Sequence, residues 1–152
     1  MAADFGWTFA ELKNEPNYLL QLAFDDVDND VFVDELGRKP TEEERKPIEQ
    51  KYKMMSDEQA NKIAEFYFKI RNKAKTIICQ CEHGQSRSAA VAAAILEYES
   101  AKGIEIFADD DYYPNKVIFK KVLKYLKITG LSQYGVNEKE LRLAARQIKW
   151  EE

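Results

Sequence analysis

Residues 76–102 read TIICQCEHGQSRSAAVAAAILEYESAK, and this stretch decides which fold the sequence predicts. The run 76–80 is short and contains β-branched residues, which favours a strand. Residues 89–102 are rich in alanine and other strong helix formers, so a helix is expected there. Residues 82–88 lie between the two and contain glycine and serine, which are typical of a tight loop. The stretch therefore predicts a strand, a loop and a helix in direct succession.

Upstream of this stretch, the sequence predicts a second strand and a long polar segment. Residues 18–24 form a short apolar run that is followed at once by several aspartates, which indicates a buried strand that ends in an acidic loop. Residues 31–56 are polar and contain Gly37, Pro40 and Pro47, so they are expected to form a long surface excursion with one short helix.

Two further helices are predicted from apolar residues at helical spacing. The first covers residues 57–73, because Ser56 and Gln59 have the spacing of a capping box and apolar positions follow. The second covers residues 117–128, and Gly130 is expected to end it.

These elements predict a single α/β domain over residues 1–152, with a central, mainly parallel twisted sheet flanked by helices. The chain has 152 residues and a mass of 17.7 kDa, and 45% of its residues are hydrophobic, which suffices for one core. The core is expected over residues 18–128. Residues 131–152 are expected to be a C-terminal extension, with a last helix over 138–150.

Composition argues against several classes of function. The net charge is −4 and the pI is about 5.2, so no overall basic field would hold nucleic acid or an anionic membrane. No apolar stretch is long enough to span a bilayer, and residues 1–9 do not resemble a secretory signal. We therefore expect a cytoplasmic protein with neither a nucleic-acid nor a membrane partner.

The chain contains only two cysteines and one histidine, namely Cys79, Cys81 and His83. Two cysteines this close do not make a disulfide framework, so they indicate thiol chemistry or core packing. A single histidine leaves no zinc-ligand cluster, and neither a metal nor a cofactor is expected. Cys79 is interpreted as a core residue.

The loop after Cys81 has the composition of an anion-binding site. Arg87 follows the cysteine by six residues, at a junction where the N–H groups at a helix N-terminus converge. The helix dipole and the guanidinium would lower the pKa of the thiol and supply a thiolate at neutral pH. Gly84 permits a sharp turn, Arg87 can bridge two phosphate oxygens, and Ser88 can donate a hydrogen bond to the thiolate.

Taken together, these residues resemble the signature of the protein tyrosine phosphatase superfamily: a Cys, five residues, an Arg, and then Ser or Thr. Residues 81–88 followed by Ala-Ala-Val-Ala-Ala-Ala are similar to small dual-specificity-like phosphatases of bacteria and phages. Residues 113–115, Tyr-Pro-Asn, add to the likeness, which covers about residues 18–128. The family usually has a His where this chain has Gln80. It also has one or two more strands before residue 18, and residues 7–12 would have to replace them at the sheet edge.

The resemblance implies a phosphomonoester hydrolase of the protein tyrosine or dual-specificity kind that works through a cysteinyl-phosphate. Cys81 would be the nucleophile, Arg87 the phosphate clamp, and an aspartate after the first strand the general acid. Asp26 is the first choice for this acid, Asp25 the second and Asp28 the third. The expected substrate-binding residues form the loop itself: Glu82, His83, Gly84, Gln85, Ser86, Arg87 and Ser88.

The substrate is expected to be a phosphorylated protein or a small phosphomonoester. A highly charged inositol phosphate fits less well, because the loop contains no lysine. Asn115 is expected to brace the phosphate loop through hydrogen bonds, since its segment should pack behind that loop. His83 is interpreted as a solvent-facing residue of the loop, although it could also contact substrate.

Several alternatives remain beside this interpretation. The loop could bind a phosphorylated partner without turnover, or it could belong to a rhodanese-like sulfur carrier, whose loop usually has one residue fewer between Cys and Arg. The aspartates after residue 24 could form a calcium loop, but Val31 and Gly37 occupy the positions where glycine and glutamate are needed. A magnesium-dependent aspartyl phosphatase would need a supporting lysine that the pattern does not show.

Overall fold

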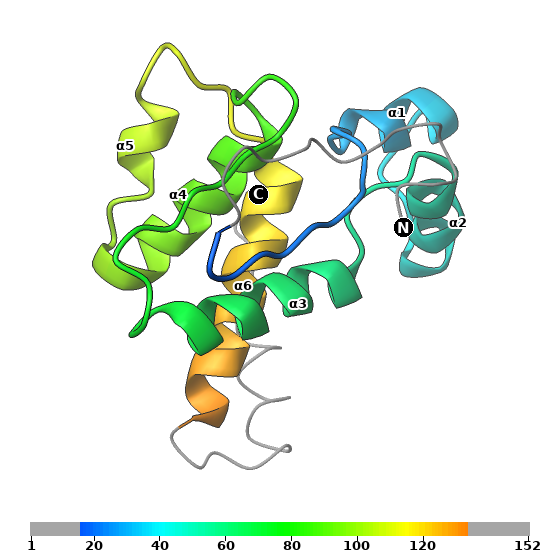
Figure 1. Ribbon diagram of the computed structural model, residues 1–152. Coiled ribbons are helices and arrows are strands. Elements are labelled where there is room, and N and C mark those ends of the chain that lie inside the picture. The colour runs from blue at the N-terminus through cyan, green and yellow to red at the C-terminus, as the bar shows by residue number, and fades with distance from the viewer. Residues whose placement is uncertain (1–15, 134–152) are drawn as a thin grey trace.

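The computed structural model describes residues 16–133 of the chain, and in that range the fold is helical (Figure 1). In chain order the helices are α1 (Asp30–Leu36), α2 (Glu42–Lys51), α3 (Asp57–Ile70), α4 (Arg87–Ser100), α5 (Ile104–Phe107) and α6 (Lys116–Ser132). No residue between 16 and 133 belongs to a β-strand. The prediction of an α/β domain around a central parallel sheet is therefore wrong for this part of the chain.

Residues 18–24, the first expected strand, are extended but lie on helices instead of pairing in a sheet. Three side chains at alternate positions pack against the helical core: Leu20, Leu22 and Phe24. Gln59 of α3 donates a hydrogen bond from Nε2 to the carbonyl oxygen of Ala23 at 2.7 Å. Alternation places side chains on one side of any extended segment, whether or not it pairs with a neighbour. The prediction of a buried strand is therefore wrong about the sheet and only partly right about burial, because Leu20, Leu22 and Phe24 are partly buried while Tyr18 and Leu19 are exposed.

Residues 76–80, the second expected strand, are also extended and unpaired within the described residues. Ile78 is 82% exposed and Ile77 is 37% exposed, so the β-branched side chains of this run do not enter a core. Cys79 between them and the loop is partly buried. The run connects α3 to the loop at Cys81 and is not part of a sheet in the described chain.

The main core lies between α3, α4 and α6, with α6 in contact with both of the other helices (Figure 1). Small residues at the contacts allow close approach of the helices, among them Ala60 and Ala64 of α3 and Ala90 and Ala94 of α4, all fully buried. The predicted capping box is confirmed, because Ser56 Oγ accepts from the Gln59 N–H at 3.1 Å and Gln59 Oε1 accepts from the Ser56 N–H at 3.0 Å.

Helix α6 continues past the position where it was expected to end. Gly130 lies inside the helix and is buried, and the helix runs on to Ser132. A Cβ atom at Gly130 would lie 2.2 Å from the hydroxyl oxygen of Tyr98 on α4. The glycine therefore serves close packing against α4, and it does not cap the helix.

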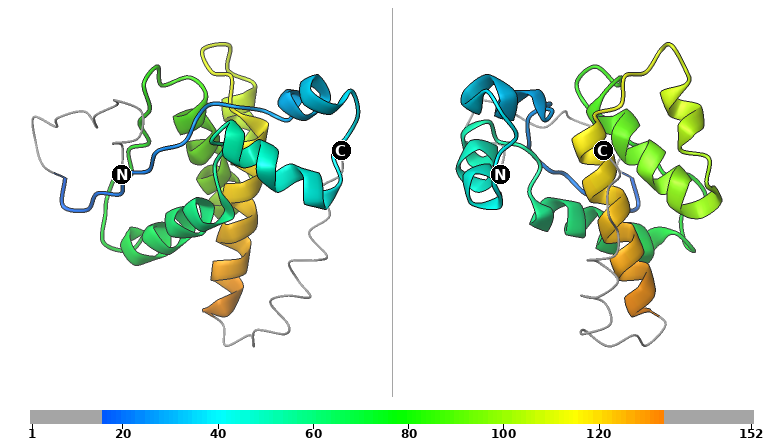
Figure 2. Two further views of the ribbon diagram at one scale, coloured as in Figure 1. Left: turned by 90° about the vertical axis from the view of Figure 1, so that its right-hand side faces the viewer. Right: turned by 180° about the vertical axis from the view of Figure 1, so that it is seen from behind.

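Residues 31–56, expected to be mostly a surface excursion, hold two helices and a second hydrophobic cluster. The buried members of this cluster are Phe32, Ile48, Met54 and Val117. Thr41 begins α2 with a capping box to Glu44. Figure 2 shows α1 and α2 to one side of the α3–α4–α6 core. The polar composition of this segment gave no sign of this small hydrophobic cluster.

Lys121 of α6 joins the two clusters. Its ammonium group donates to the carbonyl oxygen of Met55 at 2.8 Å and lies 3.7 Å from a carboxylate oxygen of Glu49 and 3.8 Å from one of Asp57. The Lys121 side chain is only 15% exposed and that of Glu49 is 22% exposed, so this pair is screened less than a surface ion pair is, whereas Asp57 is 62% exposed. The start of α3, the end of α2 and α6 therefore meet at one lysine.

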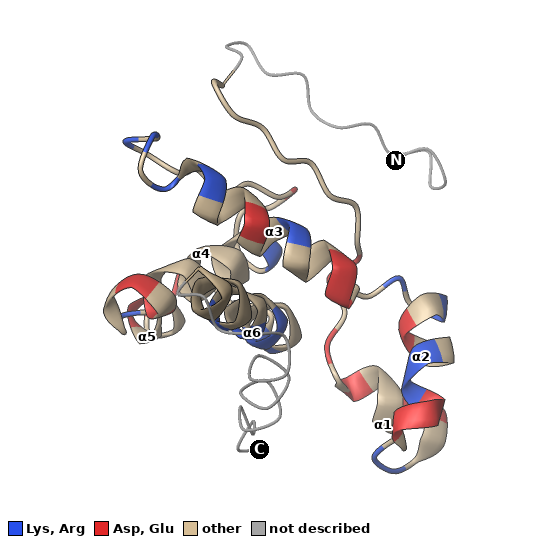
Figure 3. Cartoon of the chain, turned by 90° about the horizontal axis from the view of Figure 1, so that it is seen from below, with Lys and Arg blue, Asp and Glu red and all other residues tan. Residues whose placement is uncertain are grey.

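Acidic and basic side chains are interspersed over α2 and α3 (Figure 3). Between residues 16 and 133 no helix is long and apolar enough to cross a bilayer. The expected edge segment 7–12 and the expected helix 138–150 lie outside the described residues, as does all but the start of the extension from residue 131.

Candidate active site

The loop predicted to carry the chemistry links the extended run 76–80 to α4. Helix α4 begins at Arg87 and is 14 residues long, so its N-terminus faces the loop with its unpaired N–H groups. Gly84 adopts a left-handed conformation with φ of +74°, which an L side chain rarely adopts. Gly84 therefore provides a sharp turn in the loop between Cys81 and α4.

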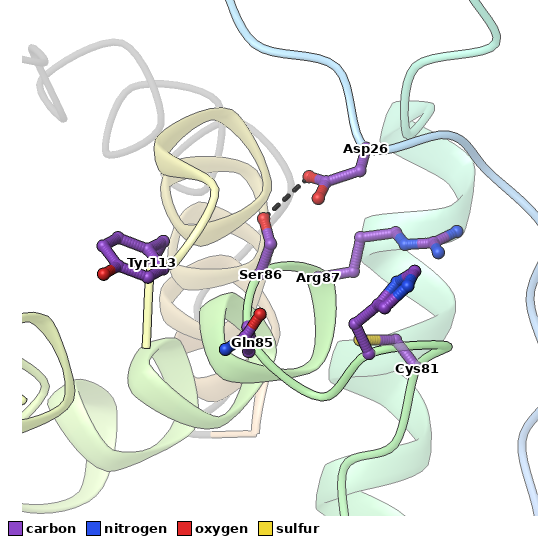
Figure 4. A pocket seen from close by; sticks show the side chains of 7 residues that line it. Asp26, Cys81, Gln85, Ser86, Arg87 and Tyr113 are labelled. Atoms are coloured by element: carbon purple, nitrogen blue, oxygen red, sulfur yellow. Dashed lines mark hydrogen bonds between the residues drawn. The ribbon is translucent and has the colours of Figure 1, made fainter. Parts of the chain in front are cut away.

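A pocket of about 190 Å³ opens at this loop. Residues from three separate segments line it: Asp26, Cys81, His83, Gln85, Ser86, Arg87 and Tyr113. In the view of Figure 4 the Arg87 side chain lies between Asp26 and Cys81, and Tyr113 lies on the far side of Ser86 and Gln85. Residues almost 90 positions apart in the sequence thus share one concave site.

The Cys81 thiol is surrounded by hydrogen-bond donors. Burial alone would raise the pKa of Cys81, but hydrogen bonds from the Ser88 hydroxyl and from the backbone N–H groups of Ser88, Gly84 and His83 outweigh it, so the pKa falls below its ordinary value. Sγ lies 3.1 Å from Ser88 Oγ. These hydrogen bonds therefore stabilise the thiolate form of Cys81 more than the surroundings of an ordinary cysteine do.

Cys79 has the opposite environment. It is a free cysteine two residues before Cys81, and burial raises its pKa to about 11. Its thiol therefore stays protonated at neutral pH. Cys79 is partly buried and belongs to neither of the two hydrophobic clusters, so its expected place in the core is not confirmed.

Arg87 lies at the first position of α4 with its guanidinium turned across the loop. Nη1 donates to the carbonyl oxygen of Phe24 at 3.0 Å, and Nη2 lies 3.5 Å from a carboxylate oxygen of Glu82. The bond to Phe24 fixes the guanidinium against the segment that carries Asp26. A guanidinium held in this way has further N–H donors to offer an oxyanion.

Of the three aspartates considered for the general acid, Asp26 is the one that lines the pocket. Its Oδ1 accepts from Ser86 Oγ at 2.8 Å and from Asn115 Nδ2 at 2.9 Å. Asp28 instead accepts from the backbone N–H of Asn29, and the N–H of Asp25 donates to Lys53. The structure places the first choice at the site and the other two outside its lining.

The predicted substrate-binding set divides into two groups. His83, Gln85, Ser86 and Arg87 line the pocket. Glu82, Gly84 and Ser88 do not. Glu82 contacts the guanidinium, Gly84 makes the turn, and the buried Ser88 supports the thiol. The side chains of Glu82 and Ser88 and the turn at Gly84 therefore support the residues that line the pocket.

Tyr113 is a pocket residue that sequence reasoning did not identify as one. Its N–H donates to the Gln85 carbonyl at 2.9 Å, and its side chain is 70% exposed. The signal was its place just before Asn115, in a segment expected to pack against the loop. The Asn115 N–H donates to the Ser86 carbonyl at 3.5 Å, so that segment does lie against the loop.

Within residues 16–133 no three His, Cys, Asp or Glu side chains group as metal ligands would. Comparisons with protein-family models, with curated proteins and with solved structures find no match to this chain.

Proposed function

We propose that this chain hydrolyses phosphomonoesters through a cysteinyl-phosphate intermediate, as the protein tyrosine phosphatases that its loop resembles do. The observation that carries the proposal is the Cys81 thiol, which receives a side-chain and several backbone hydrogen bonds at the N-terminus of α4 and has a lowered pKa. Such donors favour an anion, and the same donors suit the oxygens of a phosphoryl group bound at the loop.

In the first step, the Cys81 thiolate attacks phosphorus, and the bond from phosphorus to the ester oxygen breaks. Asp26 gives its proton to the leaving oxygen, which departs as an alcohol or phenol. Arg87 and the loop N–H groups hold the equatorial oxygens. The pocket already gathers these three side chains, since all of them line it.

In the second step, a water molecule attacks the phosphorus of the cysteinyl-phosphate. The Asp26 carboxylate takes a proton from this water, and the sulfur–phosphorus bond breaks to release inorganic phosphate. The sulfur leaves as a thiolate, which the Ser88 hydroxyl stabilises at 3.1 Å. Cys81 is then again a thiolate and Asp26 again carries a proton, so the site is ready for another turnover.

The lining of the pocket favours a substrate with a single phosphate. Arg87 is the only permanent cation among the lining residues, and the others include neutral Gln85, Ser86 and Tyr113. The additional phosphates of an inositol polyphosphate would have no cationic side chain of the pocket lining to pair with. A phosphorylated protein side chain or a small phosphomonoester fits this balance of charge.

The test is hydrolysis of para-nitrophenyl phosphate with EDTA present, measured for the intact chain and for Cys81→Ser, Asp26→Asn and Cys79→Ser. We expect Cys81→Ser to abolish turnover. Asp26→Asn should lower kcat by about 10²-fold or more, the range of general acid catalysis. Cys79→Ser should retain activity, because that thiol is outside the pocket lining.

Turnover that survives Cys81→Ser would refute the thiol mechanism. A folded chain without turnover that still binds inorganic phosphate, with binding lost in Arg87→Ala, would instead identify a phosphate-binding module.

A further inference from the structure

Asn115 occupies a central position between three parts of the site. The residue is only 6% exposed and lies at the N-cap of α6, where its Oδ1 accepts from the Ile118 N–H at 3.1 Å. Its Nδ2 donates to Asp26 Oδ1 at 2.9 Å and to the Val27 carbonyl at 3.1 Å. The cap fixes the orientation of the amide, because Oδ1 has to face Ile118 and Nδ2 then has to face the Asp26 segment.

The segment that carries Asp26 depends on such bonds for its position. In a sheet, the strand before a loop is fixed by ladder hydrogen bonds, but residues 18–24 have no strand partner in the described chain. After this segment, the Asp25 N–H is bonded to the Lys53 carbonyl at 2.9 Å. Beyond that bond, the side chain of Asn115 holds both the Asp26 carboxylate and the next carbonyl.

Both described hydrogen bonds to the Asp26 carboxylate end on the same oxygen. Oδ1 accepts from Asn115 and from Ser86, the latter bond drawn in Figure 4. A carboxylic acid needs only one oxygen to carry the transferred proton, so an anchored Oδ1 leaves Oδ2 for the leaving group. The orientation of the acid is therefore set by Asn115 on α6 and by Ser86 on the loop.

We propose that Asn115 is the positioning residue that orients Asp26 as proton donor to the leaving group. This inference rests on the proposed phosphatase function. It predicts an effect only where protonation of the leaving oxygen limits the rate. A displacement of about 1 Å at a reacting group can lower the rate roughly 10²-fold, so loss of one hydrogen bond that positions the acid is expected to lower the rate measurably.

The test compares two esters in Asn115→Ser. Serine is as good an N-cap as asparagine but is too short to reach Asp26, so the helix is kept and the bond is lost. For phenyl phosphate, whose leaving group needs a proton, we expect kcat/KM to fall by about 10- to 100-fold, as for loss of a hydrogen bond to a charged group. For dinitrophenyl phosphate, whose phenolate leaves unprotonated, we expect less than about a threefold change.

Ser56→Ala is the matched control for loss of packing and stability. It removes the capping hydroxyl of α3, away from the pocket lining, and should lower the melting temperature without changing the ratio of the two rates. Asn115→Asp is the second variant, because it keeps both the size and the cap. At neutral pH it replaces the N–H donor with a carboxylate and should show the same selective loss for phenyl phosphate.

A double-mutant cycle separates positioning from a general effect on the loop. In an Asp26→Asn background there is no acid to orient, so Asn115→Ser should then change phenyl phosphate hydrolysis by less than about twofold. An equal decrease in kcat/KM for both esters, or a decrease that persists in the Asp26→Asn background, would overturn the role of Asn115 but not the proposed phosphatase function. Absence of any Cys81-dependent turnover would overturn both.

Discussion

The extended run 76–80 and the loop 81–88 each contribute one thiol, and the two thiols differ in chemistry. Cys79 lies in the run and loses hydration without gaining a hydrogen-bond donor that would favour its charged form, so burial raises its pKa to about 11. Cys81 begins the loop and is also partly buried, yet its pKa is lowered. One residue separates them.

The difference lies in what each segment places around the sulfur. The run is extended and offers its thiol no described donor, whereas the loop turns at Gly84 and directs N–H groups and the Ser88 hydroxyl toward Sγ. Burial acts in the same direction on both thiols. The donors at the start of α4 therefore decide which cysteine can act as a nucleophile.

The largest expected effect is on the alkylation rates of the two thiols. At pH 7 we expect iodoacetamide to modify Cys81 at least about 100-fold faster than Cys79. A pKa of about 11 leaves Cys79 with very little thiolate, whereas the pKa of Cys81 is below that of an ordinary cysteine. The rates are measured by mass spectrometry on Cys79→Ser and Cys81→Ser, each of which retains one thiol. Inorganic phosphate should protect Cys81 alone. Comparable alkylation rates in the two variants would contradict the inferred difference in pKa between Cys79 and Cys81.

The next effect concerns the Ser88 hydroxyl. Ser88→Ala removes the hydroxyl, whose hydrogen bond contributes most to the lowering of the Cys81 pKa, so this pKa should rise and the thiolate fraction at neutral pH should fall. We expect alkylation at pH 7 to slow by about tenfold, as for loss of one hydrogen bond to a charged group. Raising the pH should restore the rate, because the thiolate then forms without the hydroxyl. A slow rate that does not recover at high pH would point to blocked access instead.

Local sequence signals predicted the helical part of the site well. The capping box at Ser56 gave the start of α3 correctly, and the alanine-rich stretch gave α4 to within two residues at each end. The tight loop before α4 was expected from its glycine and serine residues, whereas the place of Asp26 beside it came only from the family resemblance, which left Asp25 and Asp28 open. The two helices and the loop depend on neighbours along the chain, so one sequence contains most of the information about them.

The sheet could not be excluded from the sequence, because pairing depends on residues far apart. Leu20, Leu22 and Phe24 alternate as strand residues do, but the side of the segment that they form is covered by helices. Gly130 looked like a helix stop because its packing partner, Tyr98, lies on another helix. Asn115 was expected to brace the loop, yet its bond to Asp26 spans 89 positions and has no local signal.

The smallest expected effect tests the turn that aims the N–H groups at Cys81. Gly84→Ala should cost about 1–2 kcal/mol of stability through its φ of +74° alone, since an added Cβ would meet nothing within 4 Å. Gly37→Ala is a matched control, because Gly37 has a φ of +66° and equally open space at the end of α1. Both variants should unfold at similarly lower urea concentrations. Only Gly84→Ala should also slow alkylation of Cys81, by a fewfold, because only that turn holds an N–H against the thiolate. If Gly37→Ala slowed alkylation equally, general loosening of the chain would explain both results, and the contrast between the two cysteines would not depend on the loop.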